Sequence, residues 1–295
     1  MDYLLLFLAV ICFTGQFAFT KLFEGALKQD RVTALIMLVV TNAIGFLLFF
    51  CVSGCQIRFT PVAVLLALAM GIIMIPYYTL GIRVLSLGSL AVYSMFMMLG
   101  GMLVPFFYGV LFLREPLTWG KGLGTVLLSL SIILQSITPG DRRQEKAPHR
   151  RLFLGLCIVI FLINGMTGVI AKAHQISAAP IPESDFTALS CGITGLLSLG
   201  MLAVEKGEKR EHIGAALGKK PLWIMIGLGG SAYGGSFLHL SAAETVPASV
   251  QFPLVSGGVI VLSALVSAFF FREKVSRWEW FCVCGAFLST CLFAF

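Results

Sequence analysis

The chain has 295 residues, of which 58% are hydrophobic and only 12% are charged, and its mean hydropathy is +0.95. This composition excludes an ordinary soluble globular protein and indicates that nearly all of the chain lies in lipid. Membrane insertion and anionic lipid headgroups explain the net charge of +7, so we expect no nucleic-acid partner.

The predicted elements are long apolar segments, each close to the roughly 20 residues that a transmembrane helix requires. Ten of them leave little of the chain for soluble domains, and the first is expected to be retained rather than cleaved as a signal peptide. We therefore expect an all-α integral membrane protein with ten transmembrane helices. The segments are 3–22, 32–52, 62–82, 88–112, 120–137, 152–173, 185–204, 222–240, 247–270 and 277–295.

A short pattern closes the fourth and the ninth segment: 113–118 reads Leu-Arg-Glu-Pro-Leu-Thr and 271–276 reads Phe-Arg-Glu-Lys-Val-Ser, 158 positions later. Other residues match at the same offset. These matches indicate an internal repeat. They pair Gly71 with Gly229, Ala91 with Ser249, Val92 with Val250, Tyr93 with Gln251, and Gly100 with Gly258.

The basic stretch 139–151, which contains two prolines, is predicted to be a linker near the middle of the chain. It separates a first five-helix repeat, 1–138, from a second, 152–295. Because each half has an odd number of spans, the second half is inserted upside down relative to the first. Inverted repeats of this kind are typical of secondary transporters, which bind substrate between the two halves.

The basic residues are distributed unevenly between the two membrane surfaces. The loops after odd-numbered spans, with their span ends, hold 17 of the 21 Lys and Arg residues. Since Lys-rich and Arg-rich short loops stay in the cytoplasm, this predicts odd-numbered loops inside and both termini outside. The predicted location is the cell membrane, either a bacterial inner membrane or a plasma membrane.

The spans hold few large polar side chains, and none has an Asp or Glu near its centre. Polar groups are costly in hydrocarbon and usually face a cavity or a partner helix. From these residues we predict a mostly uncharged central cavity, formed mainly by the first, third and fourth spans and their repeat partners. The predicted substrate-binding residues are Gln16, Tyr78, Tyr93, Asn164, Tyr233, His239 and Gln251.

Each of these residues also has a packing interpretation, because polar side chains join helices in lipid. Asn42 fits an interhelical hydrogen bond better than a binding role. Of Tyr77 and Tyr78, which follow Pro76, one is expected only to pack at a helix kink. His239 is the only span residue that titrates near neutral pH, so it is either a proton carrier or a hydrogen-bonded packing residue. The glycines of the fourth, eighth and ninth spans are interpreted as packing residues.

The order of these features resembles the drug/metabolite transporter superfamily, and its EamA-type exporters in particular. The resemblance covers essentially the whole chain and is carried by Ser89-Leu90-Ala91, Pro105, the pattern 113–118, and the repeat from Val246 to Ser276. The halves are also similar to the small multidrug resistance proteins, through 246–252, 257–262 and 21–25. The resemblance implies export of metabolites or drugs.

The chain departs from the small relatives where they couple export to protons. Their membrane-embedded Glu corresponds to Phe13 in the first half and to Asn164 in the second. Met97 and Val255 stand where those relatives place an aromatic platform. Binding of a planar cation by a carboxylate is therefore not expected.

We expect a secondary transporter that moves a small amphipathic metabolite or amino acid-like solute by alternating access, with membrane lipids as its surroundings. Facilitated diffusion, or coupling through His239, is favoured over exchange through a Glu. The alternatives are a lipid-carrier flippase, which requires a basic pocket near a lateral opening, with Arg83 and Lys172 as candidates, and a multidrug efflux protein. The spans lack the groups of an enzyme, and the chain has no P-loop, so we expect no cofactor. A monomer suffices, because one chain holds both repeats.

Overall fold

The computed structural model describes residues 2–27, 30–114, 118–137, 150–205, 209–242, 246 and 248–292, in which every regular element is an α-helix. The long helices coincide with the ten predicted segments to within a few residues, whereas the short α8 was not expected. The helices are α1 (Asp2–Ala26), α2 (Arg31–Val52), α3 (Pro61–Leu87), α4 (Leu90–Phe112), α5 (Trp119–Ile137), α6 (Arg150–Gln175), α7 (Glu183–Val204), α8 (Lys209–Ala216), α9 (Lys219–Ala242), α10 (Ala248–Phe269) and α11 (Arg277–Leu292).

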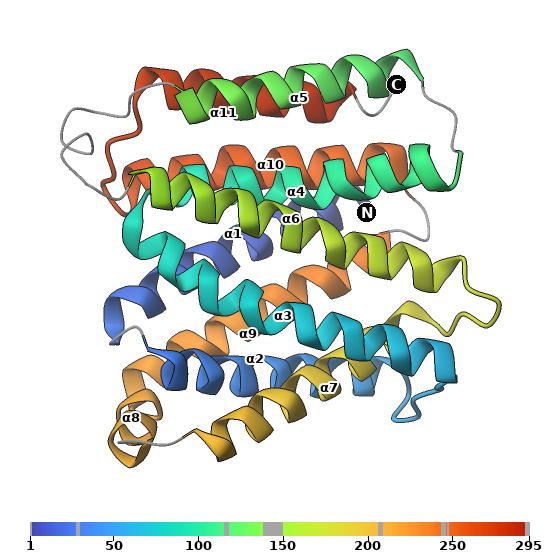
Figure 1. Cartoon of the computed structure of the whole chain (residues 1–295), viewed down its shortest axis with the longest axis vertical. Helices are drawn as coiled ribbons and strands as arrows, with labels where there is room; N and C mark the ends of the chain where they lie inside the picture. Colours follow the sequence, from blue (N-terminus) through green and yellow to red (C-terminus); the bar gives the residue numbers. More distant parts are fainter. Residues whose placement is uncertain are drawn as a thin grey trace.

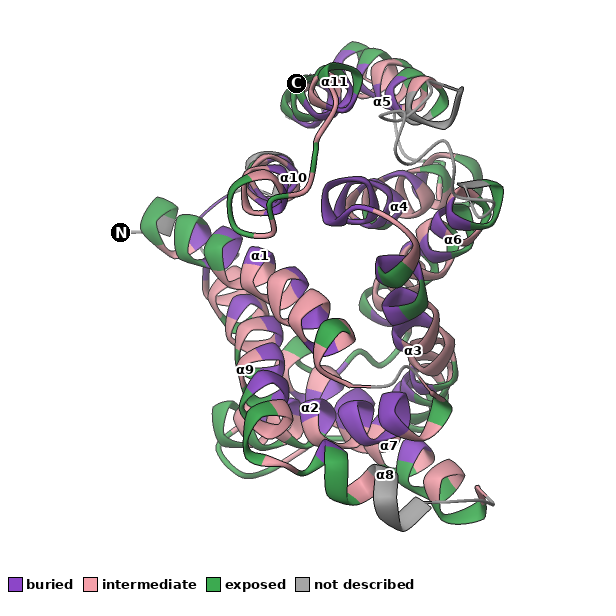
Figure 2. Cartoon of the chain, turned by 90° about the vertical axis from the view of Figure 1, so that its left-hand side faces the viewer, coloured by how far each residue is buried: buried purple, intermediate pink, exposed green. Residues whose placement is uncertain are grey.

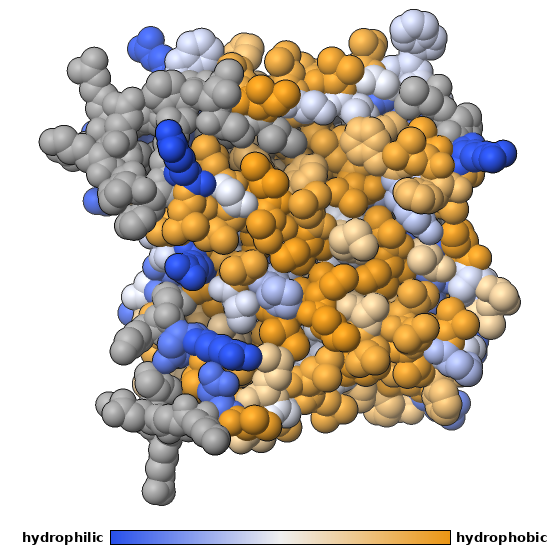
Figure 3. Space-filling model, in the orientation of Figure 1, coloured by the Kyte–Doolittle hydropathy of each residue, from blue (hydrophilic) through white to orange (hydrophobic). Residues whose placement is uncertain are grey.

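The outer surface is apolar over most of its height. In the part of the chain that the structure describes, six helices are long and apolar enough to cross a membrane: α1, α2, α3, α4, α6 and α7. Large apolar side chains such as Leu65 and Leu196 are exposed on their sides. Figure 3 shows one face that is apolar across its centre, with hydrophilic residues gathered toward the ends of the bundle. Such a surface is typical of a protein covered by lipid, and the chain is a helical membrane protein.

The long helices run across the molecule in Figure 1, so their ends form two opposite surfaces. Helices α1, α3, α5, α7 and α10 all end on the left, where α8 also lies. We call this side the basic end, because the connections there are the ones that carry most of the Lys and Arg residues in the sequence. The other side is called the opposite end. The predicted linker 139–151 lies outside the described residues except for its last two, which belong to α6.

Most helix packing joins the first part of the chain to the second. Helix α1 packs on α9 and α10, α2 on α7 and α9, α3 on α6 and α7, and α4 on α6 and α10. Helices α5 and α11 pack against each other and lie together at one side of the molecule in Figures 1 and 2. The core is therefore built between the two predicted halves rather than within each one.

Glycine permits the closest of these contacts, between α4 and α6. A Cβ atom on Gly100 would lie 2.2 Å from the carbonyl oxygen of Phe161, and one on Gly165 would lie 2.3 Å from Cβ of Val104. Small residues at such places let helix backbones approach, which is a main source of packing energy in lipid. The predicted packing role is confirmed for Gly100. Gly230, by contrast, has no atom of another described residue within 4 Å of its Cβ position.

Candidate functional site

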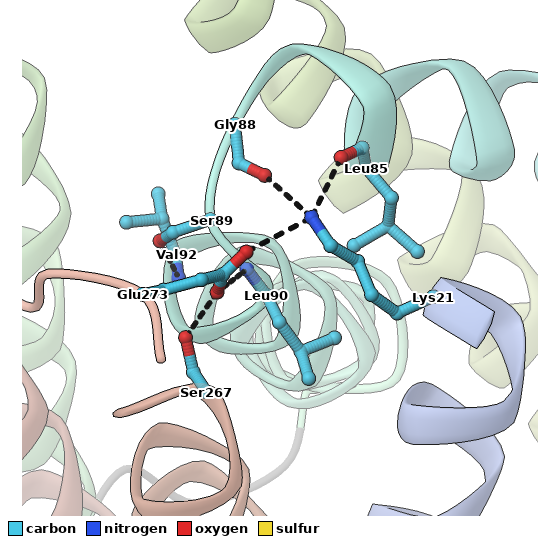
Figure 4. A network of polar contacts seen from close by, with 8 residues as sticks. All are labelled: Lys21, Leu85, Gly88, Ser89, Leu90, Val92, Ser267 and Glu273. Carbon is cyan, nitrogen blue, oxygen red and sulfur yellow. Dashed lines mark hydrogen bonds and ion pairs between the residues drawn. The ribbon is translucent and has the colours of Figure 1, made fainter. Parts of the chain in front are cut away.

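A partly buried ion pair joins the two halves of the chain at the basic end (Figure 4). Lys21 Nζ lies 2.9 Å from Glu273 Oε1, and the two side chains are only 16% and 19% exposed. The ammonium group also donates to the carbonyl oxygens of Leu85, at 3.0 Å, and Gly88, at 3.3 Å. Lys21 therefore has three acceptors, as many as it has protons.

Glu273 is held equally well. Its Oε2 atom accepts a hydrogen bond of 3.0 Å from the backbone amide of Leu90 and another from the Ser267 hydroxyl (Figure 4). Leu90 is the first residue of α4, whose amide has no acceptor within its own helix. The carboxylate thus accepts a hydrogen bond from one of the free amides of a helix start that belongs to the other half of the chain.

The two charges also match the helix ends that they touch. Lys21 contacts the last carbonyls of α3, where the helix dipole is negative, and Glu273 contacts the first amide of α4, where it is positive. The turn between α3 and α4 is therefore fixed by one cation and one anion. At each helix end the side-chain charge is opposite to that of the dipole, so the contact is favourable, and exchanging the two charges would make it repulsive.

The turn after α10 explains how Glu273 reaches this position. Arg272 adopts a left-handed backbone conformation, with φ of 54°, and the amide of Glu273 donates to the carbonyl of Ser267 at 3.0 Å. This hydrogen bond closes the turn that ends α10 and reverses the chain. The turn brings the Glu273 side chain back to the last turn of α10 and to the start of α4.

A seam of buried contacts continues from the ion pair toward the membrane centre. The hydroxyls of Ser94 in α4 and Ser263 in α10, both fully buried, lie 2.5 Å apart. Tyr93 packs edge to face on Phe17 of α1, with ring centroids 5.9 Å apart. Thr14 of α1 is 3% exposed, and its hydroxyl has no hydrogen-bond partner in the part of the chain that the structure describes.

Two of the predicted binding residues, Tyr78 and Tyr93, lie close to each other on neighbouring helices, and both are buried. The Tyr93 hydroxyl approaches α3 where Gly81 leaves space, since a Cβ atom there would lie 2.7 Å from it. Tyr78 packs edge to face on Tyr77, whose hydroxyl donates to the sulfur of Met97 at 3.2 Å. These aromatic side chains line the contact between α3 and α4.

Asn164 joins α6 to α4. Its amide nitrogen donates to the backbone carbonyl of Met97 at 2.7 Å and lies 2.7 Å from the position of a Cβ on Gly101. The side chain is half-buried, and its donor group serves this interhelical bond. Its predicted role in substrate binding stays a prediction.

Tyr233 lies apart from this group, between α9 and α2. Its hydroxyl donates to Asn42 Oδ1 at 2.9 Å, and Asn42 in turn donates to the carbonyl of Leu38. The tyrosine ring occupies space left by Gly45, where a Cβ would lie 2.6 Å from the ring. The predicted interhelical hydrogen bond of Asn42 is confirmed.

His239 and Gln251 lie near the opposite end, where α9 ends and α10 begins. The Gln251 side-chain amide donates to the backbone carbonyl of His239, and Gln251 is only 2% exposed. The His239 ring packs edge to face on Phe13 of α1, with centroids 6.3 Å apart. Gln16 lies one turn further along α1 and is half-buried, and its side chain makes no hydrogen bond with any described residue.

The seven predicted residues therefore fall into several places: Tyr78 and Tyr93 between α3 and α4, Asn164 between α4 and α6, Tyr233 between α2 and α9, Gln16 on α1, and His239 with Gln251 at the opposite end. The sequence analysis did not select Lys21 or Glu273. The available signals were the repeated Arg-Glu pattern and the lysine that ends the first span, but neither shows that the two residues meet.

Two adjoining cavities open between α2, α3 and α7 at the basic end. One, of about 600 Å³, is lined by Arg31, Arg83 and Thr79 among others, and the other, of about 690 Å³, by apolar residues of α7 such as Leu196 and Leu197. Arg31 and Met201 line both. Among the described residues, no three His, Cys, Asp or Glu side chains are grouped to hold a metal ion.

Comparison with known proteins gives a fold but no family. One solved structure, described only as "Crystal structure of protein", matches with a TM-score of 0.53 over 99% of this chain and 96% of that chain, at 17% sequence identity. Likeness at this identity shows a shared fold alone. No protein-family model and no curated protein sequence matches the chain.

Proposed function

We propose that the protein is a secondary transporter whose ten long helices form two inverted five-helix repeats. The observation that carries this proposal is the pattern of helix pairs. If α1 to α5 are matched in order with α6, α7, α9, α10 and α11, the contact of α1 with α9 corresponds to that of α6 with α3. In the same way, α1 with α10 corresponds to α6 with α4, and α2 with α9 to α7 with α3. Three of the remaining large contacts, α2 with α7, α4 with α10 and α5 with α11, join equivalent helices. The contact of α10 with α11 lies within the second half, and its counterpart, α4 with α5, is much smaller.

The backbone supports the repeat independently. Arg114 and Arg272, the arginines of the repeated pattern, both have left-handed conformations, with φ of 56° and 54°. This conformation is uncommon for residues other than glycine, and its cost is about 1–2 kcal/mol per residue. Two such turns at equivalent positions, both following a helix of the α4 and α10 pair, favour duplication of one structural unit.

Inverted repeats in a membrane favour alternating access, in which one bundle rocks against the other around a site near the middle. The polar side chains that we assign to the cavity are amides, hydroxyls and one imidazole, which suits an uncharged or amphipathic solute. We assign the substrate as a small amphipathic metabolite or amino acid-like molecule. This substrate class is taken from the EamA-type exporters, which the sequence resembles.

The test is uptake into proteoliposomes of labelled amino acids and amphipathic amines, with and without an imposed pH gradient. We expect saturable uptake that equilibrates the solute and ignores the gradient. Gln16→Ala is the informative variant, because its side chain makes no hydrogen bond to a described residue that the substitution would break. Asn164→Ala is less informative, because it also removes the interhelical hydrogen bond to Met97. Saturable uptake by no solute of the panel would count against the assigned class.

His239→Ala separates the two coupling schemes. A facilitator retains gradient-independent uptake in this variant, whereas a proton-coupled carrier loses accumulation driven by the gradient. If the parent chain accumulates solute when the gradient is imposed, and His239→Ala abolishes this accumulation, the mechanism is proton coupling through His239 rather than facilitated diffusion.

A lipid carrier is the second candidate, because the two cavities between α2, α3 and α7 provide a basic mouth beside an apolar wall. Arg83 is exposed there and forms no ion pair with a described residue, while Leu196 of the wall is 70% exposed. Headgroups with phosphate bind such basic pockets between helices. The test follows a fluorescent phospholipid between the two leaflets. Movement that is slowed by Arg83→Gln, in a protein that takes up no soluble solute, would favour this function.

A further inference from the structure

We propose that the Lys21–Glu273 ion pair is the latch that holds the basic end of the transport pathway closed, and that the chain is biased toward this closed state. The inference rests on the proposed transport function. It concerns which residues set the two states apart, rather than which solute moves.

The first argument is the place of the pair in the fold. Lys21, Leu85, Gly88 and Leu90 belong to the first half, whereas Ser267 and Glu273 belong to the second. If the end of α10 moves away from α1 and α4 at the basic end, the contacts of Glu273 with Lys21 and Leu90 must break together. The ion pair therefore exists in one state and not in the other, which is the requirement for residues that set a conformational equilibrium.

The second argument is the seam beneath the pair. The hydroxyl contact of Ser94 with Ser263 joins α4 to α10. The ring contact of Tyr93 with Phe17 joins α4 to α1. Thr14 lies seven residues before Lys21, hence about two turns deeper on the same face of α1. Its buried hydroxyl is without a partner among the described residues, as expected for a group beneath a closed seal.

The third argument is that the repeat supplies the charged groups to the other end, but not the hydroxyls. In the sequence, Glu115 is the counterpart of Glu273, and Lys172 ends the sixth span as Lys21 ends the first. At the offset of 158, Pro105 corresponds to Ser263, Gly109 to Ser267 and Phe252 to Ser94. The hydroxyls that hold the seam and the latch have no counterparts at these positions. The two ends of the pathway are therefore chemically unequal, and the added hydrogen bonds favour closure at the basic end.

The test measures access to a cysteine placed beneath the latch. Thr14→Cys changes little volume and breaks no hydrogen bond to a described residue. A membrane-impermeant maleimide is added to membrane vesicles of either orientation, and modification is quantified by mass spectrometry on the peptide that contains residue 14. Cys12 lies on the same peptide and is replaced by Ala in every chain tested, so the other seven native thiols do not contribute to the signal.

We expect Glu273→Gln to speed labelling from the basic end about tenfold, equal to about 1.4 kcal/mol in the balance of states, without speeding it from the opposite end. Lys21→Met should act alike. Lys274→Gln is the matched control, because Lys274 is the exposed neighbour of Glu273 and forms no ion pair with a described residue. Lys21→Arg, which keeps the charge, should retain slow labelling.

A reversed pair, Lys21→Glu with Glu273→Lys, should not restore closure, because each charge would then face the wrong helix end. If Glu273→Gln proves too unstable to purify, Ser267→Ala removes only the hydroxyl and should speed labelling from the same side by a smaller factor.

Unchanged labelling in folded Glu273→Gln protein would overturn the latch, and so would an equal increase from both ends, since that marks general loosening. The readout needs no substrate. If labelling shows the expected asymmetry but no solute is taken up, the result counts against the proposed function alone. If uptake occurs but labelling shows no asymmetry, the result counts against the latch alone.

Discussion

Several of the large polar side chains in this protein join helices. Asn42, Asn164 and Gln251 each donate to a backbone carbonyl, and for Asn164 and Gln251 that carbonyl belongs to another helix. Sequence analysis could identify these residues, because polar groups in apolar spans are rare. It could not separate binding from packing, because both uses satisfy a hydrogen-bonding group away from water.

Tyr233→Phe tests the packing role at one residue. It removes only the hydroxyl that bonds to Asn42 and should lower the free energy of unfolding by about 0.6–1.5 kcal/mol. Tyr108→Phe is the control, since the Tyr108 hydroxyl bonds to no described residue and its ring stacks on Phe112. Thermal unfolding in detergent should show a lower melting temperature for Tyr233→Phe alone. Equal losses in both variants would argue against the bond.

At the scale of elements, helix contacts depend on which glycine faces a backbone. Gly100 and Gly230 are both helical glycines in the sequence, yet only Gly100 lies against another main chain. The repeat indicated that Gly100 has an equivalent, Gly258, but periodicity alone does not give the distance to Phe161. That distance is set by the crossing of α4 and α6.

Gly100→Ala and Gly230→Ala should therefore have opposite effects. The first forces α4 from α6 and should destabilise the protein by about 1–3 kcal/mol. The second fills open space and improves helix propensity, with a gain of up to about 1 kcal/mol. Unfolding of the two purified variants under one detergent condition gives the comparison. A loss in both would mean that the space beside Gly230 is occupied in solution.

At the scale of the whole molecule, the charge distribution predicts orientation. The basic end is expected in the cytoplasm, with both termini outside. A reporter that is active only in the cytoplasm should be silent when fused after Phe295 and active when inserted in the linker 139–151. Activity after Phe295 with silence in the linker would reverse the orientation while leaving the helix packing as described.

The sequence by itself determined the membrane class and the positions of the long helices, because apolar runs of helical length have few other outcomes in lipid. It also located the repeated Arg-Glu pattern and the rare polar residues. Only the tertiary structure decided that Lys21 meets Glu273 at the junction of α3 and α4, or that Tyr233 bonds to Asn42. Such pairs join residues 252 and 191 positions apart. Their partners are fixed by how helices cross, which no local pattern encodes.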